Sequence, residues 1–442
     1  MHKGFVWREN KVEITSPEEA RLALDDLVYE AVFTQDDKET KTQRLALVKE
    51  LAKALGAIPA SIFGLYQAMA QEFLGFTVPA INIRGLTYDF ARAVFRVALS
   101  LDVQALIFEI ARSEISYTLQ RPLEYASVVT AAAAREGYKG PVFIQGDHFQ
   151  FKRQAFFAAP EKEEENIKKL VDEALAAEFY QIDIDASTLV ILEKPTLEEQ
   201  QHYNSLMTAE MTNYIREREP QGITVNIGGE IGEIGGHNSR PEELHAYMKE
   251  YQRHLKRPPG ISKISVQTGT AHGGVVLPDG RIAKVAVDFE TLKTLSDLAR
   301  KEYGLAGAVQ HGASTLPDEM FHLFPEVGCC EIHLATGFQN LIYDHPALPE
   351  HFREEIYSYL REHFRKEWRE GMTEAQFIYK TRKKGFGPFK KKWWDLDPKI
   401  KQEIMRDLEE KMAFLFEKLR VKGTREIVSQ TVKTPDVGDT KS

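Results

Sequence analysis

Residues 78–110, VPAINIRGLTYDFARAVFRVALSLDVQALIFEI, contain two short apolar runs separated by a segment with helical periodicity. The runs Val78–Ile83 and Ala105–Ile110 have the length and composition of buried strands, whereas Phe90 to Leu99 repeats apolar residues at helical spacing. Two buried strands joined by a helix form a parallel βαβ unit, because parallel neighbours need a long crossover connection. The segment therefore predicts an α/β fold.

The same alternation continues along the chain. Further apolar runs are candidates for buried strands, and each is separated from the next by enough residues for a helix. A total of about eight strands favours a closed (β/α)8 barrel, a TIM barrel, over an open doubly wound sheet. The further runs are Pro141–Gln145, Tyr180–Ile184, Ile223–Ile227, Ile264–Gln267, Gly307–Gln310 and Cys330–Leu334.

Helical segments are expected on both sides of the barrel. Ser16-Pro17-Glu18-Glu19 has an N-cap residue, a proline at the first helical position and acids in the first turn, and three helices are expected between residues 16 and 71. We expect four parts: an N-terminal helical extension (1–75), the barrel with a metal site (76–345), C-terminal helices with a basic loop (346–420) and a disordered tail (421–442).

The composition excludes several classes of protein. Of the 442 residues, 43% are hydrophobic and 28% are charged, as in globular proteins rather than disordered or collagenous chains. The adjacent Cys329 and Cys330 are too few and too close for a disulfide framework. The net charge of −9 argues against a nucleic-acid partner, so the basic, tryptophan-containing stretch 383–394 is better explained as a loop that reaches a phosphate.

The sequence favours a cytoplasmic protein without membrane contact. No run approaches the roughly 18 apolar residues of a membrane span. The first residues, Met1-His2-Lys3-Gly4-Phe5, lack the apolar stretch of a signal peptide.

Polar residues gather where the predicted strands end, which is where a (β/α)8 barrel builds its active site. Histidines at three of these strand ends can converge on one point, and three imidazoles with an open position are the usual ligands of a catalytic zinc. A single histidine beside a glycine is more often a hydrogen-bonding loop residue, so it is the set of three that favours a metal. The strand-end residues are Asp147 and His148, Asp183, Asp185 and Ser187, Glu230 and Glu233, His272, and His311 with Ser314.

Glycines follow two of these histidines, at Gly273-Gly274 and at Gly312. Glycine lets backbone N–H groups approach an anion closely, and Ser314 adds a hydroxyl group. The alternative is that the glycines only permit tight turns between strand and helix. Taken together, the two loops favour the binding of a phosphate or of sugar oxygens.

In their order, these motifs resemble those of the class II, zinc-dependent fructose-bisphosphate and tagatose-bisphosphate aldolases. The resemblance covers residues 76–345, and the ordered set carries it rather than any single motif. Lys391-Lys392-Trp393-Trp394-Asp395 is also similar to a loop near the C-terminus of one branch of that family. The motifs are Val78-Pro79-Ala80-Ile81-Asn82, Gly146-Asp147-His148, Ile182-Asp183 to Ser187, Glu230-Ile231-Gly232 with Gly235-Gly236, Gly269-Thr270-Ala271-His272-Gly273 and His311-Gly312-Ala313-Ser314.

The resemblance implies a zinc ion held by His148, His272 and His311, the trio that the strand ends also suggest; another divalent metal is the alternative. Such an ion polarises the carbonyl group of a ketose phosphate, so that a carbon–carbon bond breaks to leave a metal-stabilised enediolate. Asp147 matches the acid that moves the proton of the substrate hydroxyl. Its alternative role is to orient a histidine.

Other matching positions imply weaker assignments. Glu230 matches a glutamate that approaches the metal in the resting enzyme, and Asp183 or Asp185 matches an aspartate near a second cation position, which a monovalent cation could take. The residues expected to bind substrate are Asn82, Gly273, Gly312, Ser314, His333, Thr336 and Lys391.

The sequence departs from the family's pattern on the substrate side. Where the family has an acidic loop that moves a proton at the enediolate carbon, this chain has His237 and Asn238. Either His237, Glu233 or Glu243 takes over this proton transfer, or the transfer is made in a different way. The eighth-strand motif asparagine-isoleucine-aspartate-threonine becomes His333-Leu334-Ala335-Thr336.

The phosphate end of the expected site is altered as well. The position of a phosphate-binding serine after the second strand lies within Ala111-Arg112-Ser113. Arg112, Lys391 and Lys392 could supply the positive charge instead.

Three functions follow in order of preference. The first is a zinc-dependent lyase of carbohydrate metabolism, such as glycolysis, that cleaves or forms the carbon–carbon bond of fructose or tagatose bisphosphate. The second is a metal-dependent ketose epimerase or an aldolase for a different sugar, with or without a phosphate group. The third is a noncatalytic companion subunit of an aldolase, against which the retained histidines count. The habit of the family implies a homodimer or homotetramer.

Overall fold

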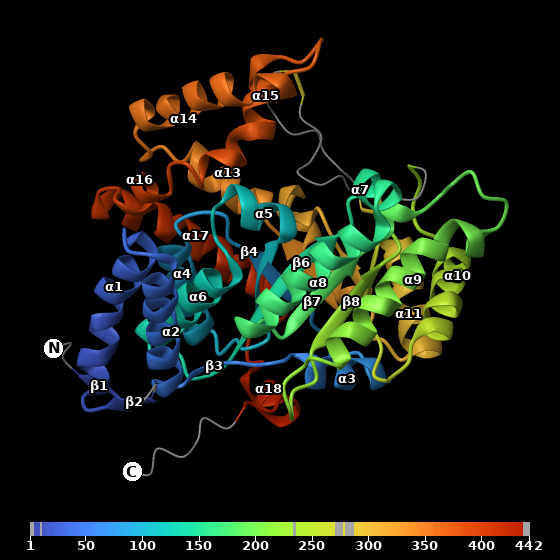
Figure 1. Ribbon diagram of the computed structural model, residues 1–442, viewed down its shortest axis with the longest axis horizontal. Helices are drawn as coiled ribbons and strands as arrows, with labels where there is room; N and C mark the ends of the chain where they lie inside the picture. Colours follow the sequence, from blue (N-terminus) through green and yellow to red (C-terminus); the bar gives the residue numbers. More distant parts are fainter. Residues whose placement is uncertain (1–3, 9–10, 233–235, 270–276, 279–286, 436–442) are drawn as a thin grey trace.

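The computed structural model describes residues 4–8, 11–232, 236–269, 277–278 and 287–435 (Figure 1). Within these residues, eight parallel strands pair in chain order, and the last pairs with the first to close a barrel. This confirms the predicted (β/α)8 architecture. The barrel strands are β4 (Val78–Asn82), β5 (Ile107–Ala111), β6 (Gly140–Gln150), β7 (Gln181–Asp185), β8 (Asn226–Glu230), β9 (Lys263–Val266), β10 (Ala308–Gln310) and β11 (Glu331–Leu334).

The strands coincide with the predicted apolar runs because a parallel barrel is covered on both faces. All five residues of β4, of β5 and of β7 are buried. The fifth barrel strand starts at Asn226, three residues later than the start of the run that predicted it.

Helices alternate with the strands and surround the barrel (Figure 1). Their caps follow the expected chemistry: Thr196 and Glu199 form a capping box at the start of α9, and Asp288 caps α11. The helices between and after the barrel strands are α4 (Thr87–Ser100), α5 (Arg112–Tyr117), α6 (Pro122–Arg135), α7 (Arg153–Ala158), α8 (Pro160–Ala176), α9 (Leu197–Arg216), α10 (Pro241–His254), α11 (Phe289–Tyr303), α12 (Leu323–Glu326) and α13 (Thr336–Asp344).

The N-terminal region contains the three predicted helices, α1 (Pro17–Phe33), α2 (Lys38–Ala54) and α3 (Phe63–Gln71). Ser16 caps α1 as its sequence predicts. The helices α1 and α2 pack against α6 of the barrel. Sequence reasoning missed the hairpin of β1 (Phe5–Arg8) and β2 (Lys11–Ile14), and the short β3 (Ala57–Pro59), which pairs with the start of β6.

The C-terminal region is helical, as expected. It contains α14 (Glu350–His363), α15 (Glu374–Thr381), α16 (Lys390–Trp394), α17 (Pro398–Lys418) and α18 (Arg425–Thr431). In Figure 1, α14 and α15 lie at the opposite end of the molecule from α3 and α18. No helix in the described part of the chain is long and apolar enough to cross a bilayer.

Two expectations for this region were wrong. The tail 421–442 is predicted to be disordered, yet its residues Arg425–Thr431 form α18, because buried Thr424 accepts hydrogen bonds from the Gln104 and Ala105 amides and buried Val428 anchors the helix. The basic stretch was expected to be a loop, yet it includes α16, whose Trp393 and Trp394 are both buried.

Candidate active site

A cleft of about 1230 Å³ opens at the carboxyl end of the barrel strands. Residues 369–383 of the C-terminal region line one side of it. The cleft brings together residues that the sequence places far apart but at equivalent strand ends. The predicted site residues that line it are Asn82, Asp147, His148, Glu230, His311, Gly312, Ser314, His333 and Thr336.

His148 lies on β6 at an irregularity in its pairing with β7, between Gly146 and Phe149. Its φ is +40°, in the left-handed region that non-glycine residues rarely adopt. The imidazole Nδ1 lies 3.0 Å from Asp185 Oδ2 and 3.2 Å from Glu230 Oε2. The irregular backbone thus aims the ring of His148 at the ends of the two following strands.

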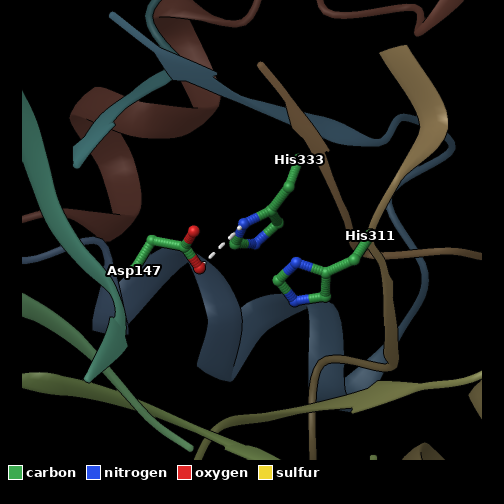
Figure 2. Close-up of side chains that lie close together, drawn as sticks. All are labelled: Asp147, His311 and His333. Atoms are coloured by element: carbon green, nitrogen blue, oxygen red, sulfur yellow. Dashed lines mark ion pairs between the residues drawn. The ribbon is translucent and has the colours of Figure 1, made fainter. Parts of the chain in front are cut away.

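His311 and His333 complete the base of the cleft (Figure 2). The ring centroid of His311 lies 4.4 Å from that of His148 and 4.0 Å from that of His333. Ser265 Oγ lies 3.0 Å from His311 Nε2, and Asp147 Oδ1 lies 3.3 Å from His333 Nδ1. Imidazoles and carboxylates from several strands therefore converge on one point.

Donor atoms of His148, Glu230 and His311 all lie within 4.8 Å of one another. Two imidazoles and a carboxylate suit a divalent transition metal such as zinc. Asp185 holds the ring of His148, and Ser265 holds that of His311, as the hydrogen-bonding partners of metal-ligating histidines commonly do. We call these three residues the outer donor set; its chemistry fits a metal ion.

Burial and mutual repulsion shift the pKa values of the acids in this cluster. Burial, together with the charge of Asp185, raises the pKa of Glu230 to about 7. Burial also raises the pKa of Glu109, on β5, to about 8. Burial opposes a charge on His148, but Asp147 and Glu230 outweigh this effect and raise the pKa of the imidazole. A cation bound in the cluster would relieve the repulsion between these carboxylates.

Beneath the cluster, Lys263 of β9 lies inside the barrel with a side chain that is 1% exposed. Its Nζ donates to Gln145 Oε1 at 2.8 Å, Asp183 Oδ2 at 2.9 Å and Glu331 Oε1 at 2.5 Å. Tyr66, from α3, donates its hydroxyl to the other oxygen of Glu331. Burial opposes a charge on Lys263, but the two carboxylates outweigh it and raise the pKa of the ammonium group. Lys263 is therefore a charged structural group and not a neutral amine nucleophile.

We expect Lys263→Met to lower the free energy of unfolding by about 3–5 kcal/mol, because it leaves two buried carboxylates without their cation. Thermal or urea unfolding measures this loss. Lys249→Met is the matched control, since Lys249 pairs with Glu198 at the surface, where such pairs contribute about 0–1 kcal/mol. Equal stability of the two variants would contradict a structural role for the buried ammonium group.

Other predicted site residues lie elsewhere. His237 is exposed, with Nδ1 2.7 Å from the Asn238 carbonyl oxygen, and it is not among the described residues that line the cleft. Lys391 also lies outside that lining: α16 buries its tryptophans and turns Lys391 towards Asp395 and Tyr29. Glu233, His272 and Gly273 fall outside the described residues.

Sequence reasoning missed several residues that line the cleft. Arg84 follows β4, and its guanidinium group donates to Glu114 at 2.8 Å and to Gln339 at 2.7 Å. Lys383, from the C-terminal region, lines the same cleft, and its Nζ lies 5.8 Å from the ring centroid of Tyr117. Arg84 directly follows the first apolar run, so its place at a strand end could have identified it as a site residue. The sequence around Lys383 gives no such indication.

The sequence matches the family model of class II fructose-bisphosphate aldolases over residues 66–387. A search of curated proteins finds no match. Two solved structures share the fold. The YdjI aldolase from Escherichia coli K12 has a TM-score of 0.50 at 13% identity, covering 83% of this chain and 100% of its own. A probable tagatose 6 phosphate kinase from Sinorhizobium meliloti 1021 has a TM-score of 0.51 at 14% identity, covering 80% and 93%.

The family model spans most of the chain and includes the whole barrel. It agrees with the resemblance carried by the strand-end motifs and with the cleft at which the described strand ends meet. This protein belongs to the class II fructose-bisphosphate aldolase family and is a lyase of that metal-dependent family.

Proposed function

We propose that the protein is a zinc-dependent aldolase that cleaves or forms the carbon–carbon bond of a ketose phosphate such as fructose or tagatose bisphosphate. The observation that carries the proposal is the outer donor set of His148, Glu230 and His311 at the base of a cleft with cationic side chains. A metal ion bound there supplies a Lewis acid that polarises the substrate carbonyl. His272, which the family resemblance adds to the ligands, is part of this proposal.

We assign the contacts with the substrate's hydroxyl groups to Asp147 and Asn82. Asp147 lines the base of the cleft, and we assign it the transfer of a hydroxyl proton. Asn82 donates through Nδ2 to Glu114 at 2.6 Å, while its buried oxygen has no hydrogen-bond donor among the described residues. That oxygen can accept a hydrogen bond from a substrate hydroxyl.

The walls of the cleft suit a phosphorylated substrate. Gly312 has a φ of +68°, and Ser314 follows it in the same turn, so backbone N–H groups and a hydroxyl are available to an anion. Burial and the nearby positive charge of Arg84 both oppose a charge on Lys383 and lower its pKa. An anionic ligand bound beside Lys383 would relieve this repulsion. The cationic side chains of the lining are Arg84, Arg112, Lys152, Arg369, Lys380 and Lys383.

The remaining assignments complete the proposal. We assign the transfer of the second proton, at the carbon next to the carbonyl, to Glu233; His237 and Lys391 are left out of the site because they lie outside the described lining of the cleft. Five further assignments rest on the family alone. They are zinc as the resident metal, a monovalent cation near Asp185, a cytoplasmic location, a place in glycolysis or a related route, and a homodimer or homotetramer.

The proposal is tested by a cleavage assay with fructose and tagatose bisphosphates, with the unphosphorylated sugars as controls. We expect cleavage of a bisphosphate that a chelator stops and added zinc restores. Cleavage or epimerisation of an unphosphorylated sugar instead would move the assignment to another member of the metal-dependent class. Full metal occupancy without activity on any of these sugars would contradict the proposal.

We expect Lys383→Met to raise KM for the bisphosphate by about 10-fold or more, because a hydrogen bond to a charged group contributes about 1.5–3 kcal/mol. The kinetics of the two phosphorylated substrates measure this change. Lys392→Met is the control, since the exposed Lys392 of α16 pairs with Glu355 of α14, outside the described lining of the cleft. An unchanged KM in Lys383→Met would remove this lysine from substrate binding.

A further inference from the structure

One side of the helix α15 forms part of the wall of the cleft. Phe377 and Ile378 are buried on its other side, where α15 packs against α14. The residues of this segment that line the cleft recur at intervals of three and four, the spacing that places side chains on one face of a helix. We call them the α15 face, and they are Met372, Gln376, Tyr379, Lys380 and Lys383.

Hydrogen bonds hold the α15 face in place from two sides. At the start of the helix, Thr373 Oγ1 donates to the carbonyl oxygen of Pro278, in the connection between β9 and α11, at 2.8 Å. After its end, buried Arg382 donates to both carboxylate oxygens of Asp344 on α13, at 2.6 and 3.0 Å. A bidentate pair of this kind fixes orientation as well as distance. The α15 face is therefore in position before a substrate binds, which lowers the entropic cost of binding.

The α15 face carries two cations that lack a counter-ion. Lys380 is exposed and Lys383 is half-buried, and neither forms an ion pair within the part of the chain that the structure describes. The next residue, Lys384, pairs instead with Glu367 and is not among the described residues that line the cleft. Lysine ammonium groups form strong, charge-assisted hydrogen bonds to phosphate and carboxylate oxygens. The two lysines of the α15 face are thus available to an anionic group of a ligand.

The cleft offers an anion a second position, at the turn of Gly312. That turn directly follows His311, so an anion bound there lies beside the outer donor set. Lys383 lies elsewhere on the wall, near the ring of Tyr117 on α5, which follows β5. In the barrel, β11 and β4 separate β5 from β10, the strand that leads to Gly312. The two positions are therefore separate, and only the turn of Gly312 is next to the metal ligands.

A ketose bisphosphate presents two phosphates that differ in their distance from the carbonyl. One is attached to the carbon next to the carbonyl, and the other is at the far end of the carbon chain. In cleavage, the hydroxyl proton passes to Asp147, the electron pair of the broken carbon–carbon bond stays with the carbonyl half, and the far half leaves as an aldehyde. The turn of Gly312 suits the phosphate beside the carbonyl, which leaves the α15 face for the phosphate of the aldehyde half.

We propose that the α15 face determines specificity for the aldehyde half of the substrate, and that Lys380 and Lys383 select an aldehyde that carries a phosphate. The inference rests on the proposed function, because it divides the two ends of that substrate between two parts of the wall. Chemistry at the carbonyl then depends on the base of the cleft and the turn of Gly312, without a contribution from α15. Removing charge from the α15 face should change which aldehyde is accepted and leave the carbonyl half unaffected.

Two reactions of the zinc-loaded protein separate the halves. Exchange of the C–H hydrogens of dihydroxyacetone phosphate with deuterated water needs the carbonyl half alone, whereas condensation of this compound with an aldehyde needs both. The ratio of kcat/KM for glyceraldehyde 3-phosphate to that for glyceraldehyde measures the selection of a phosphorylated aldehyde. We expect Lys383→Met to lower this ratio by about 10-fold or more, because a charge-assisted hydrogen bond is lost, and to leave the exchange rate unchanged.

Two further variants and a matched control accompany this test. Lys380→Met, at an exposed position, should lower the ratio in the same direction, so the test does not depend on the folding of Lys383→Met. Lys384→Met is the control, since it removes the neighbouring charge from outside the described lining, and it should keep the wild-type ratio and exchange rate. Ser314→Ala should lower exchange and condensation together, because Ser314 belongs to the turn beside the metal ligands.

The outcomes separate this inference from the proposed function. A wild-type ratio in Lys380→Met and Lys383→Met, with exchange intact, would overturn the inference and leave the proposed function standing. Equal losses of exchange and condensation in these variants would place the lysines at the carbonyl half and would also overturn it. Absence of exchange in the zinc-loaded wild type would overturn the proposed function itself, and this inference with it.

Discussion

His311→Asn is expected to lose the bound metal ion and, with it, all measurable aldol cleavage. His311 belongs to the outer donor set at the base of the cleft, so an ion bound there loses one of its imidazole ligands when the side chain is replaced. Metal analysis of the purified variant after dialysis measures the first effect, and the bisphosphate cleavage assay measures the second.

His345→Asn controls for the loss of a buried imidazole as such, because His345 pairs with Asp407 away from the cleft. This variant should keep its metal and its activity. Stoichiometric metal in His311→Asn would show that the ion binds elsewhere and would remove the basis of the proposed site.

Asp147→Asn is expected to lower kcat by about 10²-fold or more while saturating zinc still gives one ion per chain. A positioned acid–base group contributes on this scale, and an amide of nearly the same size cannot take up the proton. Steady-state kinetics under zinc saturation measure the effect, and the change should fall on kcat rather than on KM.

Asp318→Asn is the matched control, because Asp318 forms an exposed pair with Lys411 on the outer surface. An unchanged kcat in Asp147→Asn would leave this carboxylate with a structural or metal-binding role alone. In that event another group, such as Glu109, would have to accept the proton.

The barrel was predictable because strands that are covered on both faces read as continuous apolar runs. The alternation between residues 78 and 334 follows directly from this physics. The hairpin β1–β2 and the helix α18 were not predictable in this way. Their residues are mixed in polarity, and α18 depends on hydrogen bonds that the distant amides of Gln104 and Ala105 donate to Thr424.

The base of the site was predictable for a related reason. Carboxyl ends of neighbouring parallel strands meet at one end of a barrel, so Asp147, His148, Glu230 and His311 had to lie near one another. His333 was expected to contact substrate, but its approach to His311 and Asp147 depends on how the two rings pack and could not be derived from its position alone.

The cationic side chains that line the cleft, and the buried charged residues Lys263 and Glu331, could not be predicted from local patterns. Lys383 reaches the cleft only because the C-terminal helices pack back over the barrel, which is a tertiary effect. Lys263 and Glu331 stand at the starts of two strands, where a charged residue normally marks the strand's exposed end. Their mutual neutralisation inside the barrel depends on contacts between strands far apart in sequence.

The central claim is that this cleft performs metal-dependent chemistry next to the carbonyl of a ketose phosphate. Exchange of the C–H hydrogens of dihydroxyacetone phosphate with deuterated water, followed by nuclear magnetic resonance, tests it without knowledge of the aldehyde partner. We predict that the zinc-loaded protein catalyses this exchange, that a chelator stops it and that zinc restores it. Absence of exchange at full zinc occupancy, or exchange that the chelator leaves unchanged, would contradict the account.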